Sequence, residues 1–162
     1  NYSIERSYFP SLVERRETFV AYVYRGYWID IGTPGKYVQV HQDIMSGAFS
    51  AAPFAGAPGT AWTEGARIED GAHVTGPCFI DEGATVKAGA RIEPYSVIGR
   101  QCTVEEGATV RGSIVWTGSW ISRDAVVDGA ILGRNVHIGR NVTVQPGRVL
   151  GDKSVLTDYT QA

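Results

Sequence analysis

The chain has 162 residues, 43% of them hydrophobic and 20% charged, which is enough for one or two small globular units with buried cores. Its formal net charge of −2 excludes the basic excess that binds a nucleic-acid backbone or an anionic membrane. No apolar run approaches the roughly 18 residues that span a bilayer, and the N-terminus lacks the order of a signal peptide. We therefore expect neither a nucleic-acid nor a membrane partner. Cys78 and Cys102 form no CxxC motif and no disulfide framework, so we expect a protein of the reducing cytoplasm.

Residues 1–47 form a first region, of mixed and aromatic composition. The stretch FPSLVERRE (9–17) predicts one or two helical turns, and the β-branched and aromatic residues of TFVAYVYRG (18–26) predict a strand. A longer helix follows, because Thr33 suits the N-cap, Pro34 the first helical position, and Gly47 the end. Residues 48–61 are small residues with Pro and Gly, a composition typical of a linker.

Residues 62–162 repeat with a period of six, which neither a helix nor a plain strand explains. The repeat places an aliphatic residue in every hexad and a small side chain two residues before most of them. One residue is dropped near Gly112 and another near Gly129. The aliphatic positions are Ile68, Val74, Ile80, Val86, Ile92, Ile98, Val104, Val110, Val115, Ile121, Val127, Leu132, Ile138, Val144, Leu150 and Leu156.

A short strand followed by a turn accounts for this period. The aliphatic and the small residue point into one core, and the turn needs a residue that tolerates positive φ. Gly or Asn recurs three positions after many of the aliphatics, for example at Gly83, Gly107 and Asn135.

The pattern resembles the hexapeptide repeat, [LIV]-[GAED]-x-x-[STAV]-x. That resemblance implies a left-handed parallel β-helix of triangular cross-section, here with about five coils. The predicted fold is thus mainly β, a β-helix preceded by a small α/β remnant. The left-handedness comes from the resemblance alone, since the general crossover rule favours the opposite hand.

One face of the predicted β-helix carries an apolar residue just before the core aliphatic in each coil. These residues form a stripe one residue wide: Phe79, Val97, Ile114, Ile131 and Val149. Exposed apolar surface of this kind marks a contact. We expect the stripe to pack against a catalytic domain or between subunits of a homo-oligomer.

The first region carries a second resemblance. It contains SIE at 3–5, FP at 9–10 and GYWIDIGTPGKY at 26–37, in that order. These motifs resemble the end of the nucleotidyltransferase domain of sugar-phosphate nucleotidyltransferases, and most closely the mannose-1-phosphate guanylyltransferases. The resemblance implies transfer of a nucleotide from a nucleoside triphosphate to a sugar 1-phosphate, with release of pyrophosphate.

The same resemblance assigns Asp30 as a ligand of the catalytic Mg²⁺, and a hard divalent cation does prefer carboxylate oxygens. Capping of the next helix, or pairing with Arg25 or Lys36, is the alternative role for this carboxylate. Gly32 and Thr33 would lie near the sugar-phosphate pocket and shape the turn, and Trp28 is expected in the core. The Gly-rich loop of the nucleotide-binding half does not occur in this sequence. We therefore expect the C-terminal portion of a longer enzyme, inactive by itself.

Other hexapeptide-repeat proteins offer alternative functions. An acyltransferase would use a histidine as base, and the repeat offers His73 and His137. A carbonic anhydrase would need three zinc histidines that converge, and the register places these two on different faces. A purely structural oligomerisation module is the third alternative. Cys78 and Cys102 occupy small inward sites on different faces, which argues against a disulfide.

Overall fold

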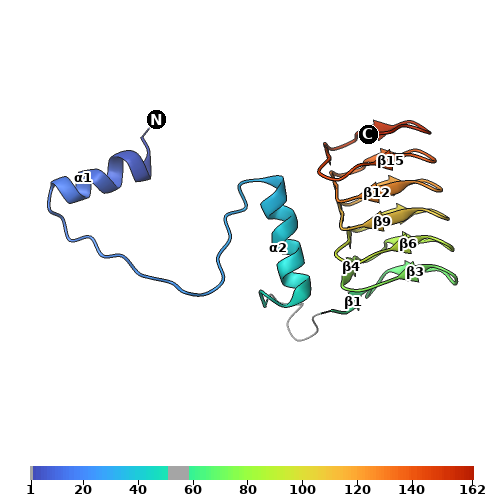
Figure 1. Cartoon of the computed structure of the whole chain (residues 1–162), viewed down its shortest axis with the longest axis horizontal. Coiled ribbons are helices and arrows are strands. Elements are labelled where there is room, and N and C mark those ends of the chain that lie inside the picture. Colours follow the sequence, from blue (N-terminus) through green and yellow to red (C-terminus); the bar gives the residue numbers. More distant parts are fainter. Residues whose placement is uncertain (1, 51–58) are drawn as a thin grey trace.

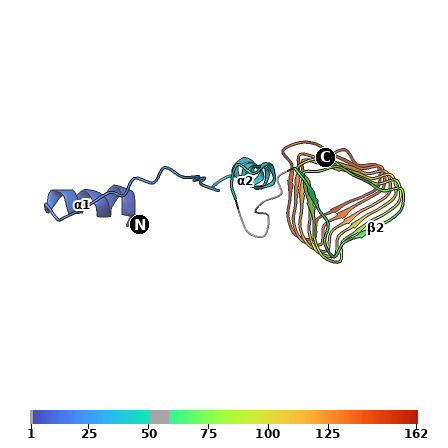
Figure 2. The same ribbon diagram turned by 90° about the horizontal axis from the view of Figure 1, so that it is seen from below.

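A computed structural model describes residues 2–50 and 59–162 of the chain. From residue 61 onward, short parallel strands wind into a β-solenoid of about six turns with a triangular cross-section (Figures 1 and 2). The predicted mainly β architecture is confirmed, with one turn more than the repeat suggested. The proposed linker at 48–61 falls largely outside the described residues.

Strands separated by two others stack in register and form three parallel sheets. The first sheet, called sheet A here, contains β1 (Ala61–Trp62), β4 (Cys78–Ile80), β7 (Val97–Ile98), β10 (Ile114–Val115), β13 (Ile131–Leu132) and β16 (Val149–Leu150). Sheet B contains β2 (Arg67–Ile68), β5 (Thr85–Val86), β8 (Thr103–Val104), β11 (Trp120–Ile121), β14 (His137–Ile138) and β17 (Val155–Leu156). Sheet C contains β3 (His73–Val74), β6 (Arg91–Ile92), β9 (Thr109–Arg111), β12 (Val126–Asp128) and β15 (Thr143–Val144).

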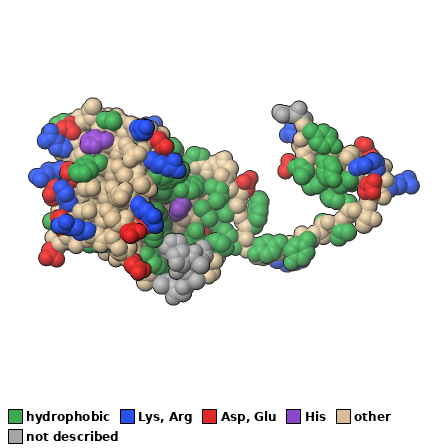
Figure 3. Space-filling view, turned by 180° about the vertical axis from the view of Figure 1, so that it is seen from behind, with side chains coloured by type: hydrophobic (Ala, Val, Ile, Leu, Met, Phe, Trp, Pro, Cys, Tyr) green, Lys and Arg blue, Asp and Glu red, His purple; other side chains and the backbone are tan. Residues whose placement is uncertain are grey.

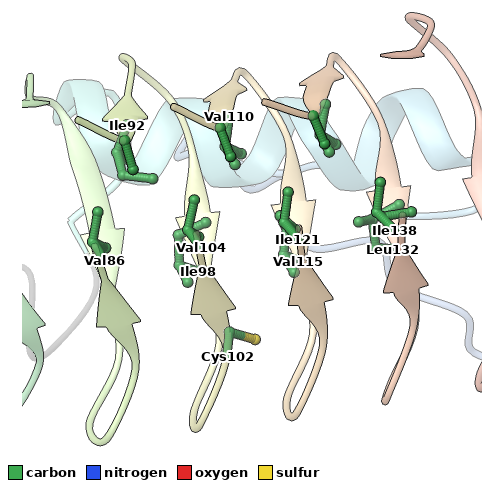
Figure 4. Close-up of a cluster of buried hydrophobic side chains, with 14 of the residues drawn as sticks. Val86, Ile92, Ile98, Cys102, Val104, Val110, Val115, Ile121, Leu132 and Ile138 are labelled. Carbon is green, nitrogen blue, oxygen red and sulfur yellow. The ribbon is translucent and has the colours of Figure 1, made fainter. Parts of the chain in front are cut away.

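Each hexad aliphatic predicted from the sequence lies in one of these strands, and those of the middle coils fill the core. Figure 4 shows Val86, Val104, Ile121 and Ile138 stacked along the axis inside the solenoid. Their side chains are fully buried, whereas Ile68 in the first coil is 37% exposed. The core therefore consists of columns of aliphatic side chains that are best covered where a coil has neighbours on both sides.

The corners between strands require backbone of the left-handed region. Gly83 has φ 71° and Asn135 has φ 54°, as the recurring Gly or Asn predicted. The sequence pattern missed corners built from other residues, such as Gln101 at φ 54° and Asp124 at φ 58°. Corner geometry is therefore fixed by the stacking of the coils and not by residue type alone.

Buried serines support the two corners where the repeat drops a residue. The Ser113 hydroxyl lies 2.8 Å from the Arg111 carbonyl oxygen and 3.2 Å from that of Val127 in the next coil. The same oxygen accepts a hydrogen bond of 3.0 Å from the Ala130 amide. Ser113 thus satisfies buried backbone groups of two successive coils, which alanine at this small site could not do.

Replacing Ser113 should lower the stability of the solenoid measurably. We expect Ser113→Ala to lower the free energy of unfolding by about 1–3 kcal/mol, because buried carbonyl and amide groups lose their partner. The matched control is Ser154→Ala, whose hydroxyl bonds the Gly151 carbonyl in a partly exposed turn where water can replace it. Denaturant unfolding measures both, and equal losses for the two variants would contradict the role of Ser113.

The N-terminal region contains helices and no strand among its described residues. A π-helical turn (η1, Ile4–Tyr8) leads into α1 (Phe9–Glu14), and a longer helix follows as α2 (Pro34–Ser46). The predicted start and end of α2 are confirmed: the Thr33 side chain accepts from the Lys36 amide, and Gly47 ends the helix at φ 82°. The strand predicted over 18–26 is wrong, because no neighbouring strand pairs with its backbone there.

Both cysteines are free thiols in the solenoid core. Burial raises the pKa of Cys78 and of Cys102 to about 11. The Cys102 thiol also donates a 3.1 Å hydrogen bond to the Trp116 carbonyl oxygen. The two residues act as small core side chains, in agreement with the sequence prediction.

Thiol labelling tests this burial. Because the thiolate is the reactive form, a pKa near 11 predicts that both cysteines label slowly at pH 8 in the folded chain and rapidly in denaturant. The labelling rate of the folded chain should rise with pH until the pKa is reached. Rapid labelling of either residue at pH 8 under native conditions would contradict the burial.

Candidate functional site

The apolar stripe lies along the outer face of sheet A, and α2 runs beside it. Register pairs its five residues coil by coil: Phe79, Val97, Ile114, Ile131 and Val149. Figures 1 and 2 both place α2 next to this sheet, along the stack of coils. One residue was missed by the repeat pattern, since Trp62 of β1 pairs with Phe79 and adds a sixth member.

The C-terminal half of α2 makes the tighter contact with the stripe. Met45 is only 3% exposed, and with His41 and Ile44 it closes a small cavity of about 150 Å³ against Phe79 and Val97. Burial lowers the pKa of His41, so the neutral imidazole is favoured in this apolar contact. Its ring meets that of Tyr37 edge to face at 4.7 Å.

The N-terminal half of α2 lies less closely against the C-terminal coils of the solenoid. Val149 is 53% exposed, whereas Ile114 in the middle of the stripe is 2% exposed. A mostly apolar groove of about 510 Å³ opens there between the start of α2 and the solenoid, and Trp116 lies on its wall. The Trp116 ring centroid is 6.4 Å from that of Tyr37, so this tryptophan does contact α2.

Asp30 lies in the extended segment that precedes α2. Its side chain is exposed and lines a shallow hollow of about 200 Å³ with Lys36, Gln39 and Asp43 of α2. A methyl group at Gly32 would stand 3.7 Å from both carboxylate oxygens of Asp30. The structure therefore brings Asp30, Gly32 and the Thr33 cap together at the start of the helix. Trp28 is 77% exposed, so its expected place in the core is wrong for the described residues.

Asp30 offers one carboxylate toward a metal ion, without further ligands grouped around it in the described residues. Within residues 2–50 and 59–162, no group of three or more His, Cys, Asp or Glu side chains could hold a metal ion. Mg²⁺ commonly takes one or two protein carboxylates and completes its shell with phosphate oxygens and water. A single exposed carboxylate beside an open hollow suits a shared site of that type and not a closed one.

Two contacts that hold the Asp30 segment have no signal in the sequence. The Tyr27 hydroxyl donates a 2.6 Å hydrogen bond to the Asp43 carboxylate, and the Tyr27 ring stacks on Phe49 at 4.7 Å. The donor and acceptor are sixteen residues apart and belong to no repeat or motif. Only the fold of the segment over α2 reveals them.

The two histidines of the solenoid do not share a site. His73 lies in β3 of sheet C, whereas His137 lies in β14 of sheet B. A zinc site would need histidine side chains that converge on one metal ion. Within one chain these two residues give no such arrangement.

A comparison with family models decides the relationship. A model described as the GMPPB C-terminal domain, the hexapeptide-repeat region of the mannose-1-phosphate guanylyltransferase family, matches residues 74–161. The chain belongs to this family. The match begins within β3 and covers the solenoid to β17, so the family assignment rests on the coils themselves. A search of curated proteins found no match.

For this family member, the GYWIDIGTP segment lies outside the matched region and depends on α2 for its position.

None of the helices in the described part of the chain is long and apolar enough to cross a membrane. Figure 3 shows apolar side chains gathered on the arm that carries α1, while charged side chains are spread over the solenoid.

A charged side chain placed in the stripe beneath α2 should weaken the contact between the helix and the solenoid. We expect Ile131→Glu to loosen the N-terminal half of α2. Ile131 is 9% exposed and lines a hollow with Pro34 and Val38 of that helix. An unpaired carboxylate there costs roughly 2 kcal/mol or more, while the inward core stays intact. Limited proteolysis should then cut within α2 and leave the solenoid whole. The matched control is Thr109→Glu, an outward position on sheet C away from α2. Protection of α2 in both variants would contradict the contact.

Proposed function

We propose that this chain is the C-terminal part of an enzyme that converts mannose 1-phosphate and GTP to GDP-mannose and pyrophosphate. The observation that carries the proposal is the placement of the GYWIDIGTP segment. Asp30 stands at the start of α2, and α2 lies on a solenoid of the mannose-1-phosphate guanylyltransferase family. A solenoid of this family thus carries, through α2, the Asp30 carboxylate that the motif resemblance assigns to the metal.

The role of Asp30 follows from the chemistry of nucleotidyl transfer. An oxygen of the sugar 1-phosphate bonds to the α-phosphorus of the nucleoside triphosphate, and the bond from that phosphorus to pyrophosphate breaks. Bound Mg²⁺ would neutralise charge on the phosphate oxygens. Asp30 would hold one side of that ion, and its exposed position leaves the opposite side open to phosphate and to a second carboxylate.

A nucleotide-binding half is needed to complete this site. We propose that it supplies the Gly-rich loop, the second carboxylate and the groups that recognise the base. The exposed apolar arm before Asp30 supports this: Val20 is 82% exposed, Tyr22 89% and Val23 72%. Exposed apolar side chains of this kind suit a contact with a neighbouring domain.

The solenoid would serve as the support of this half-site. Its outer stripe holds α2, and the open part of the stripe around Val149 leaves apolar surface for the catalytic half or for a second subunit. Nucleoside triphosphate and sugar 1-phosphate would bind above Asp30, near Gly32 and Thr33. The carbonic anhydrase alternative receives no support within the described residues, since His73 and His137 lie on different sheets.

Replacing Asp30 tests the proposed function. In the enzyme that joins these residues to a nucleotide-binding half, we expect Asp30→Asn to lower the rate of GDP-mannose formation by about 100-fold, because the metal loses a charged ligand. Asp70→Asn, an exposed acid in the first coils, is the matched control and should leave the rate unchanged. Equal rates for the two variants would refute the assignment, and so would turnover by the 162-residue chain alone.

A further inference from the structure

The segment that carries Asp30 is fastened to α2 at both of its ends. At the far end, the Tyr27 hydroxyl donates a 2.6 Å hydrogen bond to the Asp43 carboxylate in the C-terminal half of the helix. At the near end, Thr33 caps the first turn through the Lys36 amide. Residues 28–32 therefore span the helix between two fixed points.

The Tyr27 contact is built from two interactions of different kinds. The hydrogen bond to a carboxylate is short and charge-assisted, which makes it stronger than a bond between neutral groups. The Tyr27 ring also stacks on Phe49 with an interplanar angle of 21°. The hydrogen bond to Asp43 raises the pKa of Tyr27 to about 12, so the hydroxyl remains a donor throughout the physiological pH range.

The contact has a local effect. Helix α2 has its own anchor on the solenoid through Met45 and Ile44, so neither the helix nor the coils depend on Tyr27. Before Tyr27, the arm is exposed and forms no strand in the described residues. The segment that the contact orders is therefore the one bearing Asp30, which lies along the same hollow as Asp43.

We propose that Tyr27 and Asp43 are positioning residues, which hold Asp30 where it can bind the metal ion. The inference rests on the proposed function, because it presumes that Asp30 is a metal ligand. Its physical basis is the entropy of five free residues: a ligand on an untethered segment must lose that freedom when the metal binds. The tether removes this cost beforehand, and residues that orient a ligand commonly change metal affinity by about 10–100-fold.

The test uses the enzyme that joins this chain to its nucleotide-binding half, with Mn²⁺ as the probe. Binding of Mn²⁺ is followed by electron paramagnetic resonance, and the Mg²⁺ concentration for half-maximal rate is measured alongside. We expect Tyr27→Phe and Asp43→Leu to weaken both about tenfold. Asp43→Asn keeps an acceptor oxygen and should bind the metal nearly as the unaltered protein does. Tyr22→Phe, at an 89% exposed tyrosine, is the matched control.

The outcomes separate the two proposals. If Asp30→Asn weakens Mn²⁺ binding but Tyr27→Phe behaves as Tyr22→Phe does, the positioning role is overturned and the proposed function stands. If Asp30→Asn leaves Mn²⁺ binding unchanged, the metal assignment fails and the positioning role fails with it. Thermal unfolding of each variant should match that of the unaltered protein, which shows that a changed metal affinity does not reflect loss of the fold.

Discussion

Helix α2 lies along sheet A because the outward side chains of that sheet are apolar in every coil from Trp62 to Val149. A β-solenoid normally exposes its outward positions to water, and here sheet C does so with residues such as His73 and Arg91. The stripe on sheet A therefore needs a cover, and α2 provides it with Met45 and Ile44. The place of the GYWIDIGTP segment relative to the coils follows from this single contact.

The solenoid gives the contact between α2 and sheet A a rigid base. Each coil bonds its neighbours through parallel strands, and buried serines such as Ser113 satisfy backbone groups where the repeat loses a residue. Exposed ion pairs such as Arg111–Asp128, 2.9 Å apart, connect successive coils at the surface but add little stability there. Asp30, which lies beside α2, is thus held against a stiff scaffold. The segment before Tyr27, residues 18–26, has no such support.

Sequence reasoning succeeded where one physical cause acts in every repeat. Burial of one aliphatic per hexad imposes a period of six, so the core, the strands and the stripe could all be predicted. Helix caps are similarly local, which is why Thr33 and Gly47 were assigned correctly. The strand over 18–26 failed because strand formation requires a partner, and β-propensity does not supply one. The contact of Tyr27 with Asp43 was beyond prediction, since it depends on how a non-repeating segment folds back over a helix.

Sheet A holds α2, and with it the segment bearing Asp30. Hydrogen exchange of the unaltered chain, read residue by residue, tests this most directly. Amides in the C-terminal half of α2, around Met45, should exchange slowly, as those of the sheet A strands do, while residues 18–26 should exchange at nearly the rate of an unfolded chain. Rapid exchange throughout α2, with the solenoid still protected, would contradict it.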